Sequence, residues 1–378
     1  MSAARIWTIP ETVVDRAPNQ LIEGPMTLSQ PVFKPVTDAD YTRLVSGQVC
    51  PHRAAVEWDS YAQMLGDRPI WRGKRLVYLG PDGQAPRAVL TLRQFHLRTM
   101  DFLWAEDNPV WIGAEPTVRE EKELVDALGA YVRQKDPRQA FIRLSVLHHD
   151  DVEGLVPTCQ DLCAHDATVF IDLSGDEAAL RSRMKARGRR AVNKAGRVCE
   201  ATVAEETDIT EADFAAVGRV MEETAERDGF PAHTTSYYWN FFEHFRSRGL
   251  ARLWVARIDG RPVNWAMFII FGDFATYEIA ASTPEAQRNY SPDLTLYTAL
   301  LALQGDGVRL VDLVAVGTDF NPALRTLNQF KTKWNDEITP VSAPMELVLK
   351  PNRYRLMNKI VVVRDQVVAR RSAADPQD

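Results

Sequence analysis

The same order of predicted elements occurs twice in the sequence, once on each side of a strongly basic segment. In each half, three strands, a helix and a buried strand follow one another. In the first half these elements are expected at residues 75–79, 88–95, 102–105, 118–134 and 140–146. In the second half they are expected at residues 252–258, 262–271, 274–280, 292–304 and 309–316. Two copies of one β-β-β-α-β unit in a chain of this length predict two fused α/β domains.

Short-range signals support these turns and helices. An Asp-Gly pair follows the first strand of each half, at residues 82–83 and 259–260, and supplies the positive φ angles of a tight hairpin turn. The helices are predicted from apolar residues three or four positions apart, which form one face. These residues are Leu124, Leu128 and Val132 in the first half, and Leu296, Leu300 and Leu303 in the second. A chance run of similar elements is the alternative to a true repeat.

The composition is that of an ordinary globular protein. The chain has 378 residues, of which 45% are hydrophobic and 25% charged, enough to bury a core in each half. The four cysteines lack the spacing of a disulfide framework and the first residues lack an export signal, so a reducing cytoplasm is expected. The longest apolar stretches, such as residues 265–271, are too short to cross a bilayer. The formal net charge of -6 argues against a general nucleic-acid coat but allows a local basic face.

A basic helix is predicted between the two halves. Ser174 and Glu177 have the spacing of a capping box and would begin it. No acidic residue interrupts the basic run that follows, so phosphate is a natural partner. A solvated face that is neutralised by the acidic segment 205–211 is the alternative. The basic residues are Arg181, Arg183, Lys185, Arg187, Arg189, Arg190, Lys194 and Arg197.

The repeated unit resembles a GNAT-type acyltransferase. In those folds the turn from strand to helix carries a glycine-rich loop whose amides hold the coenzyme A pyrophosphate. Here residues 287–292 have the sequence Gln-Arg-Asn-Tyr-Ser-Pro, and residues 108–111 have Asn-Pro-Val-Trp. Side chains at these positions would keep a pyrophosphate away from the backbone amides. Acyl-CoA is therefore a weaker candidate for the donor.

Several segments extend this resemblance to most of the chain. They are the strand at residues 167–173 before the basic helix, the Ala-Ala-Ser at 280–282, the helix that opens at Pro292, and the Phe-Lys-Thr-Lys-Trp block at 330–334. From about Trp58 to Tyr354 the sequence resembles the Fem family of non-ribosomal peptidyltransferases. Members of that family look like two fused GNAT domains and take an amino acid from aminoacyl-tRNA. The chain is similar to the compact members that lack a long helical arm.

The resemblance implies an α/β (α+β) fold of two tandem GNAT-like domains, each a mixed, mostly antiparallel sheet flanked by helices. The domains are expected at residues 1–164 and 165–341, with a C-terminal helix within 342–378 that packs back on the first. That last helix, from Tyr354 to Val368, is also basic enough to lie on an anionic membrane surface, which is the alternative.

The implied activity is aminoacyl-tRNA-dependent transfer of an amino acid to an amine of a peptidoglycan precursor stem peptide. The acceptor would be lipid II or UDP-MurNAc-pentapeptide, and the product a cross-bridge. The alternative is an N-acyltransferase that uses acyl-CoA or aminoacyl-tRNA and acts on a small peptide-like metabolite. Because the donor ester is already activated, no cofactor is expected. We expect a cytoplasmic monomer that contacts the inner face of the plasma membrane only through a lipid-linked acceptor.

The resemblance also assigns roles to individual residues. Lys331, in the Phe-Lys block, is the predicted catalytic cation: it would stabilise the negative charge that forms on the ester carbonyl oxygen during attack by an amine. The family's aromatic-x-x-Arg-Gly-Pro segment is replaced here by Trp104 to Pro109, so Asp107, together with Glu106, is predicted to orient or deprotonate the attacking amine. The predicted acceptor-binding residues are Phe330, Tyr277, Trp104, His233 and Tyr237. The predicted tRNA-binding residues are Arg187, Arg189, Arg190 and Lys194.

Two groups of possible metal ligands are predicted not to bind metal. Adjacent residues such as His148 to Asp151 seldom converge on one ion, so a solvated loop is expected there. Cys159, Cys163 and His165 are better spaced but lack a clear fourth ligand, which favours incidental cysteines in a joining segment.

Overall fold

The computed structural model describes residues 32–66, 68–80, 83, 85–97, 100–158 and 164–356. The chain divides into two compact units. Unit 1 comprises Met1–Gln48, Gly66–Gln160 and Pro344–Asp378, and unit 2 comprises Val49–Leu65 and Asp161–Ala343. Within the described ranges, no helix is both long and apolar enough to cross a bilayer.

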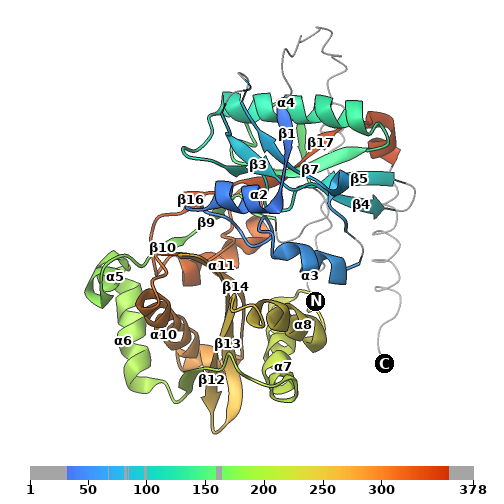
Figure 1. The fold of residues 1–378 in the computed structure, drawn as a ribbon. Helices are drawn as coiled ribbons and strands as arrows, with labels where there is room; N and C mark the ends of the chain where they lie inside the picture. The colour runs from blue at the N-terminus through green and yellow to red at the C-terminus, as the bar shows by residue number, and fades with distance from the viewer. Residues whose placement is uncertain are drawn as a thin grey trace. The chain divides into compact units, whose positions relative to one another are not determined.

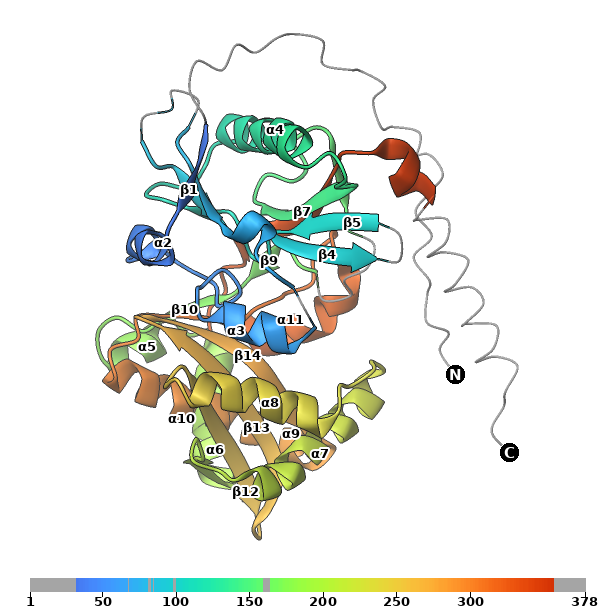
Figure 2. The same ribbon diagram turned by 45° about the vertical axis from the view of Figure 1, so that its right-hand side comes forward.

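Unit 1 contains two sheets and a long helix (Figure 1). One sheet has the order β1-β2-β3-β6, with β1 at Phe33–Val36, β2 at Arg75–Tyr78, β3 at Ala88–Leu90 and β6 at Val110–Trp111. The other has the order β4-β5-β7-β17-β8, with β4 at Arg93–Leu97, β5 at Met100–Trp104, β7 at Phe141–Val146, β17 at Ala343–Val348 and β8 at Leu155–Pro157. Helix α4 (Val118–Lys135) begins with a capping box between Thr117 and Glu120. Figure 2 shows α4 beside these strands, and its residues Leu124 and Leu128 are fully buried.

Unit 2 is built on one large sheet with helices on both faces. The strand order is β10-β15-β14-β13-β12-β11, with β10 at Phe170–Asp172, β15 at Leu310–Asp312, β14 at Phe274–Ser282, β13 at Arg261–Phe271, β12 at Ala251–Ile258 and β11 at Thr202–Glu205. Only β14 and β15 pair in parallel; the other neighbouring strands described here are antiparallel. A separate two-stranded sheet joins β9 (Ala167–Thr168) to β16 (Thr339–Pro340). The large sheet of unit 2 is therefore mixed and mostly antiparallel, as the sequence predicts.

Helices lie on both sides of the sheet of unit 2 (Figure 1), and two layers of buried apolar side chains hold them there. On one face, Trp254 and Phe268 of the sheet pack with Leu296 and Leu300 of α10 (Ser291–Gly305) and with Val192 of α6 (Ala186–Val198). We call this layer the α10 core. The opposite face, which we call the α8 core, carries the helices α3 (Trp58–Met64), α7 (Glu211–Asp228) and α8 (Thr235–Arg246). Because neighbouring strand residues point to opposite faces, Trp265 and Met267 lie in the α8 core while Ala266 and Phe268 lie in the α10 core.

Two details of the predicted elements are wrong. The expected strand at 88–95 is two strands, β3 and β4, which lie in different sheets. The expected strand at 309–316 ends at Asp312, because Val314 and Ala315 have the positive φ values 57° and 21°. The hairpin at Asp259-Gly260 is confirmed, with φ values of 49° and 77° and Ile258 paired with Arg261. Asp82, in the other predicted turn, lies outside the described residues.

The predicted basic helix is two helices, and its predicted cap is wrong. Helix α5 (Glu177–Arg183) is capped by Asp176, whose side chain accepts a hydrogen bond from the Ala179 amide, and not by Ser174. The chain is then extended at Met184 and Lys185 before α6 begins at Ala186. Met184 is buried in the α10 core at this break.

Helix α6 makes a close backbone contact with the segment that follows α11 (Arg325–Lys331). The Lys185 amide donates to the Lys333 carbonyl oxygen at 3.1 Å. A Cβ atom at Gly188 would lie only 2.2 Å from that same oxygen. Glycine is therefore required at position 188, whereas Gly196 on the same helix has no atom within 4 Å of where a Cβ would be.

This difference predicts opposite effects for two alanine substitutions in one helix. Gly188→Ala should lower the free energy of unfolding by about 1–3 kcal/mol, because the added methyl group displaces the Lys333 backbone. Gly196→Ala should raise it by about 0.5–1 kcal/mol through helix propensity. Urea denaturation of the two variants tests the packing directly. Equal effects would show that α6 does not rest on Lys333.

Candidate functional site

The two parallel strands at the centre of unit 2 diverge after a short paired stretch. β15 pairs with β14 only where residues 310–312 face residues 274–276. The chain after β15 then turns to the other side, where the Leu313 amide donates to Val169 O and the Val316 amide to Ala167 O, each at 3.0 Å. β14 remains paired with β13 as far as Ser282. In the described structure, one edge of β14 from Tyr277 onward thus has no partner strand.

A strained turn lies where β15 leaves β14. Val314 and Ala315 have positive φ angles, which are unfavourable for residues with a Cβ and most of all for a β-branched one. The carbonyl oxygens of both residues accept hydrogen bonds from Lys331 Nζ, at 2.7 and 2.8 Å. The ammonium group therefore holds the turn in this conformation.

Lys331 is a buried cation. It is the last residue of α11, and its exposed fraction is only 7%. Burial lowers the pKa of Lys331 to about 8, although the nearby Asp312 carboxylate acts in the opposite direction. Asp312 is half-buried, desolvation raises its pKa, and it accepts hydrogen bonds from Thr168 Oγ1 and the Val314 amide. At neutral pH Lys331 remains mostly protonated.

The residues that follow Lys331 are fixed from both sides. Thr332 accepts a hydrogen bond from Arg187 of α6. Lys333 forms an ion pair with Asp293 in the first turn of α10, and its Nζ lies 4.3 Å from the centre of the Phe330 ring. Burial lowers the pKa of Lys333, and Asp293 opposes that shift. The segment 330–334 is thus held between α6 and α10.

The N-terminus of α10 differs from a phosphate-binding helix start. Tyr290 is in the left-handed conformation just before it, with φ 66°, and no side chain caps the helix. The Asp293 carboxylate is nine-tenths buried and already paired with Lys333. A pyrophosphate bound here would meet the Tyr290 side chain and the Asp293–Lys333 ion pair where a glycine-rich loop would offer bare amides.

The predicted residues of unit 2 fall into two groups. Phe330 and Tyr277 both pack against the α10 core, on the side that carries the Phe-Lys block. Burial raises the pKa of Tyr277, and the negative charge of Asp293 adds to this. Tyr237 instead packs against the α8 core, and the exposed His233 ring stacks on it with ring centres 4.0 Å apart. His233 and Tyr237 thus form an aromatic platform on the opposite face of the sheet.

The predicted residues of unit 1 lie at the end of β5. The guanidinium of Arg143 covers the Trp104 ring at 4.7 Å from its centre. Asp107 is half-buried in the turn after the strand and has a positive φ of 50°. Its neighbour Glu106 is buried with a carboxylate oxygen 3.5 Å from Arg93 Nε. All of these residues belong to unit 1, and the roles given to Asp107 and Trp104 remain predictions.

The four predicted tRNA-binding residues have different surroundings. Arg189 donates to the carbonyl oxygens of Arg181 and Met184, so it stabilises the end of α5. Arg187 is exposed but engaged with Thr332. Arg190 is exposed, and Lys194 is exposed with its Nζ 4.7 Å from the centre of the Tyr290 ring. Arg190 and Lys194, together with the exposed Arg197, are the better candidates for an external phosphate.

The described residues contain no cluster of three or more side chains suited to a metal ion. His148 is bound to Glu121, which accepts from its Nδ1 and its amide at 2.8 Å. Cys159 and Cys163 lie outside the described residues. Neither Cys50 nor Cys199 is part of a disulfide bond.

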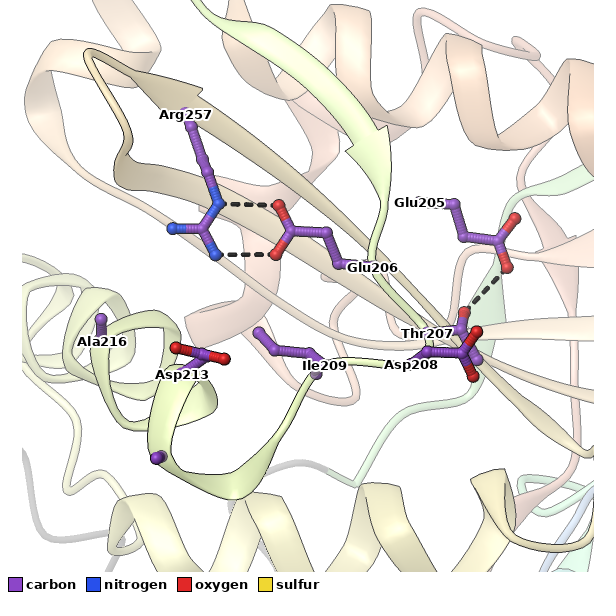
Figure 3. Close-up of a pocket in the computed structure, with 9 residues that line it drawn as sticks. Glu205, Glu206, Thr207, Asp208, Ile209, Asp213, Ala216 and Arg257 are labelled. Carbon is purple, nitrogen blue, oxygen red and sulfur yellow. Dashed lines mark hydrogen bonds and ion pairs between the residues drawn. The ribbon is translucent and has the colours of Figure 1, made fainter.

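A pocket in unit 2 lies away from the Phe-Lys block (Figure 3). It is lined by the acidic segment after β11 and by the start of α7, and none of the predicted site residues lines it. Glu206 accepts two hydrogen bonds of 2.7 Å from Arg257, and Glu205 accepts one from Thr207 (Figure 3). Glu205 also accepts a hydrogen bond from Arg252. Because Glu205 and Glu206 already have arginine partners, these two carboxylates are not free to neutralise α6.

Sequence reasoning missed several residues of the site. Asp312 and Asp293 have no local pattern that distinguishes them from other acids, and the positive φ angles at Val314 and Ala315 occur without any glycine. Glu278 and its partners His52 and Arg53 were also missed, because Arg53 and Glu278 lie 225 residues apart in the sequence.

Comparisons with known proteins agree with this geometry. Residues 181–322 match the family model described as an acetyltransferase (GNAT) domain. The crystal structure of FemX is similar over 86% of this chain and 99% of that chain, with a TM-score of 0.65 and 14% sequence identity. No curated protein sequence matches the chain.

Other solved structures are similar at lower TM-scores. A conserved protein of unknown function from Bacteroides thetaiotaomicron has a TM-score of 0.51 and 10% identity, over 84% of this chain and 100% of that one. The C-terminal domain of a protein from Agrobacterium fabrum, named as a putative lysylphosphatidylglycerol synthetase, has a TM-score of 0.50 and 14% identity, over 82% and 92%. The chain is thus a tandem protein of the GNAT fold. Within that class its fold is FemX-like, which confirms the resemblance predicted from the sequence.

Proposed function

We propose that this protein is an aminoacyl-tRNA-dependent aminoacyltransferase that acts on an amine of a peptidoglycan precursor stem peptide. The observation that carries the proposal is the buried ammonium group of Lys331 at the point where β14 and β15 diverge. A cation that is fixed before the reaction can stabilise a developing negative charge without the cost of reorientation.

In the proposed reaction, the acceptor amine attacks the carbonyl carbon of the ester that links the amino acid to the tRNA ribose. The carbonyl oxygen becomes anionic in the tetrahedral intermediate, close to the Lys331 ammonium. The carbon–oxygen bond to the ribose then breaks, an amide is formed and the ribose hydroxyl leaves with a proton. The attacking nitrogen must lose a proton, and Asp107 is the proposed acceptor for it. Such chemistry needs no metal or redox cofactor.

Two features favour a charged tRNA over acyl-CoA as the donor. The N-terminus of α10 holds the Asp293–Lys333 ion pair where an acyl-CoA enzyme would bind pyrophosphate. The exposed side of α6 carries Arg190, Lys194 and Arg197 without a neutralising acid in the same helix. A polyanion is the ligand that such a surface suits best.

The structure constrains the identity of the acceptor substrate less than that of the donor. The neighbour named as a lysylphosphatidylglycerol synthetase makes an aminoacylated lipid by its name, and a lipid-linked acceptor at the inner face of the plasma membrane suits a cytoplasmic enzyme of similar fold. A small peptide-like metabolite is the second candidate. It is favoured by Asp107, which stands where the resemblance leads one to expect arginine, and by the adjacent buried acid Glu106.

The proposal is tested by incubating the full chain with a mixed pool of charged tRNAs and either lipid II or UDP-MurNAc-pentapeptide. We expect consumption of the tRNA ester and a product heavier by one amino acid residue, detected by mass spectrometry. Lys331→Met should reduce the turnover number about 100-fold or more, because the developing oxyanion loses its cation. Stabilisation by acetyl-CoA without ester consumption would favour the acyl-CoA alternative.

A control separates chemistry from folding in this experiment. Loss of Lys331 also releases the strained turn, so Lys331→Met is combined with Val314→Gly, which removes the penalty at positive φ. The double variant should unfold near the wild-type temperature and stay inactive. Lys122→Met, on the surface of unit 1, should be fully active. Near-normal turnover in the double variant would dismiss Lys331 as the catalytic cation.

A second prediction concerns the basic face of α6. The triple change of Arg190, Lys194 and Arg197 to Ala should weaken tRNA binding and reduce its salt dependence, by roughly 0.7–0.9 in the log–log slope for each phosphate interaction that the change removes. The matched control replaces the exposed Arg119, Arg133 and Lys135 of α4 with Ala, which removes the same charge. Filter-binding titrations at several salt concentrations give both slopes. Equal slopes for the two triple variants would exclude α6 as the tRNA surface.

A further inference from the structure

Glu278 occupies an irregular position in β14. On either side of it, Tyr277 pairs with Phe268 and Ile279 pairs with Met267, so Glu278 is an extra residue without an opposite partner in β13. This arrangement is a β-bulge, which redirects a side chain and locally interrupts a strand pair. It places Tyr277 against the α10 core and Ile279 against the α8 core.

The Glu278 carboxylate is held through only one of its oxygens. Arg53 Nη2 donates to Oε1 at 2.8 Å, and His52 Nε2 lies 3.5 Å from the same atom. The His52 ring is fixed in turn by edge contacts with Trp58, Phe241 and Phe245 of the α8 core. Both contacts come from the segment just before α3, which belongs to unit 2. The carboxylate is therefore oriented by residues from a distant part of the sequence.

The second oxygen, Oε2, is available for another group. No donor among the described residues contacts it, although the Glu278 side chain is only 9% exposed. Oε2 is not fully buried, so solvent can reach it. The bulge lies just beyond Thr276, on the part of β14 whose edge β15 has left. A preoriented carboxylate oxygen at such an edge is suited to a hydrogen-bond donor that carries positive charge.

We propose that Glu278 binds a primary ammonium group of a substrate through Oε2, with Arg53 and His52 as positioning residues. This proposal rests on the proposed function, in which both substrates contain such a group: the α-ammonium of the aminoacyl donor and the amine of the acceptor. The interaction would orient the substrate in unit 2 and distinguish free amines from acylated ones. Nothing in this binding step requires tRNA.

The test uses two probes that differ only in this group, alaninamide and N-acetylalaninamide. Saturation-transfer NMR titrations on the full wild-type chain should show about tenfold tighter binding of alaninamide, because only it makes the charge-assisted hydrogen bond. Glu278→Gln should bind both probes alike. Glu285→Gln, on the exposed helix α9 (Pro284–Arg288), removes the same charge and should keep the preference.

The outcomes separate this proposal from the transfer activity. A wild-type chain that binds both amides equally, or a Glu278→Gln variant that keeps the preference, would overturn the amine site. If Glu278→Gln only lowers the melting temperature, the ion pair with Arg53 is structural and the proposal fails. Should that variant not fold, Glu278→Asp retains the charge but withdraws the oxygen, and it should lose most of the preference. Amine preference without ester consumption would leave this site in place while the proposed function fails.

Kinetics in the transfer assay then identify which substrate supplies the ammonium group. If it belongs to the donor, Glu278→Gln should raise KM for aminoacyl-tRNA about tenfold and leave KM for the acceptor unchanged. If the ammonium group belongs to the acceptor, Glu278→Gln should raise KM for the acceptor and leave KM for aminoacyl-tRNA unchanged. Either pattern supports the site, whereas a fall in kcat with both KM values unchanged would contradict a role in binding.

Discussion

The candidate site depends on the contact between the Lys331 ammonium and the carbonyl oxygens of Val314 and Ala315. Neither residue would adopt a positive φ angle in isolation, and a buried lysine would not keep its charge without acceptors. The ammonium group therefore stabilises the strained turn, and the carbonyl oxygens of the turn stabilise the buried charge. Their combination fixes a cation at the turn after β15, just beyond the point where β15 stops pairing with β14.

Contacts with α6 and α10 hold the segment around Lys331 in one position. Gly188 lets α6 touch the Lys333 backbone, and the ion pair between Lys333 and Asp293 joins the same segment to α10. The helix whose exposed side is basic is thus in direct contact with the residues next to Lys331. If charged tRNA binds along α6, its interaction energy can be used to align the ester with the ammonium, which is how remote binding contributes to catalysis.

The sequence contained most of the architecture because the signals for it are local. The Asp259-Gly260 turn and the leucine spacing of α10 are short-range patterns, and both are present in the structure as predicted. Where a choice between neighbouring residues depended on packing, prediction failed. Asp176 caps α5 in place of Ser174, and the apolar run through Thr91 and Leu92 concealed a change of sheet between β3 and β4.

The chemistry of the site was only partly accessible from the sequence. The Phe-Lys block identified Lys331, but nothing in the sequence indicates that Val314 and Ala315 would turn their carbonyl oxygens toward it. Glu278 meets Arg53 only after the segment before α3 has joined unit 2. Such contacts depend on tertiary structure, so a single sequence contains no spacing rule from which they could be derived.

The central claim is that Lys331 is a buried ammonium held by two carbonyl oxygens, and direct titration of its Nζ tests this best. In protein labelled with ¹⁵N at the lysine side chains, the Lys331 resonance can be assigned by its absence in Lys331→Met. The account predicts a signal with slow hydrogen exchange that is protonated at neutral pH and loses its proton near pH 8, since burial lowers the pKa to about 8. A resonance that exchanges rapidly and titrates at the ordinary lysine pKa of 10.5 would contradict it.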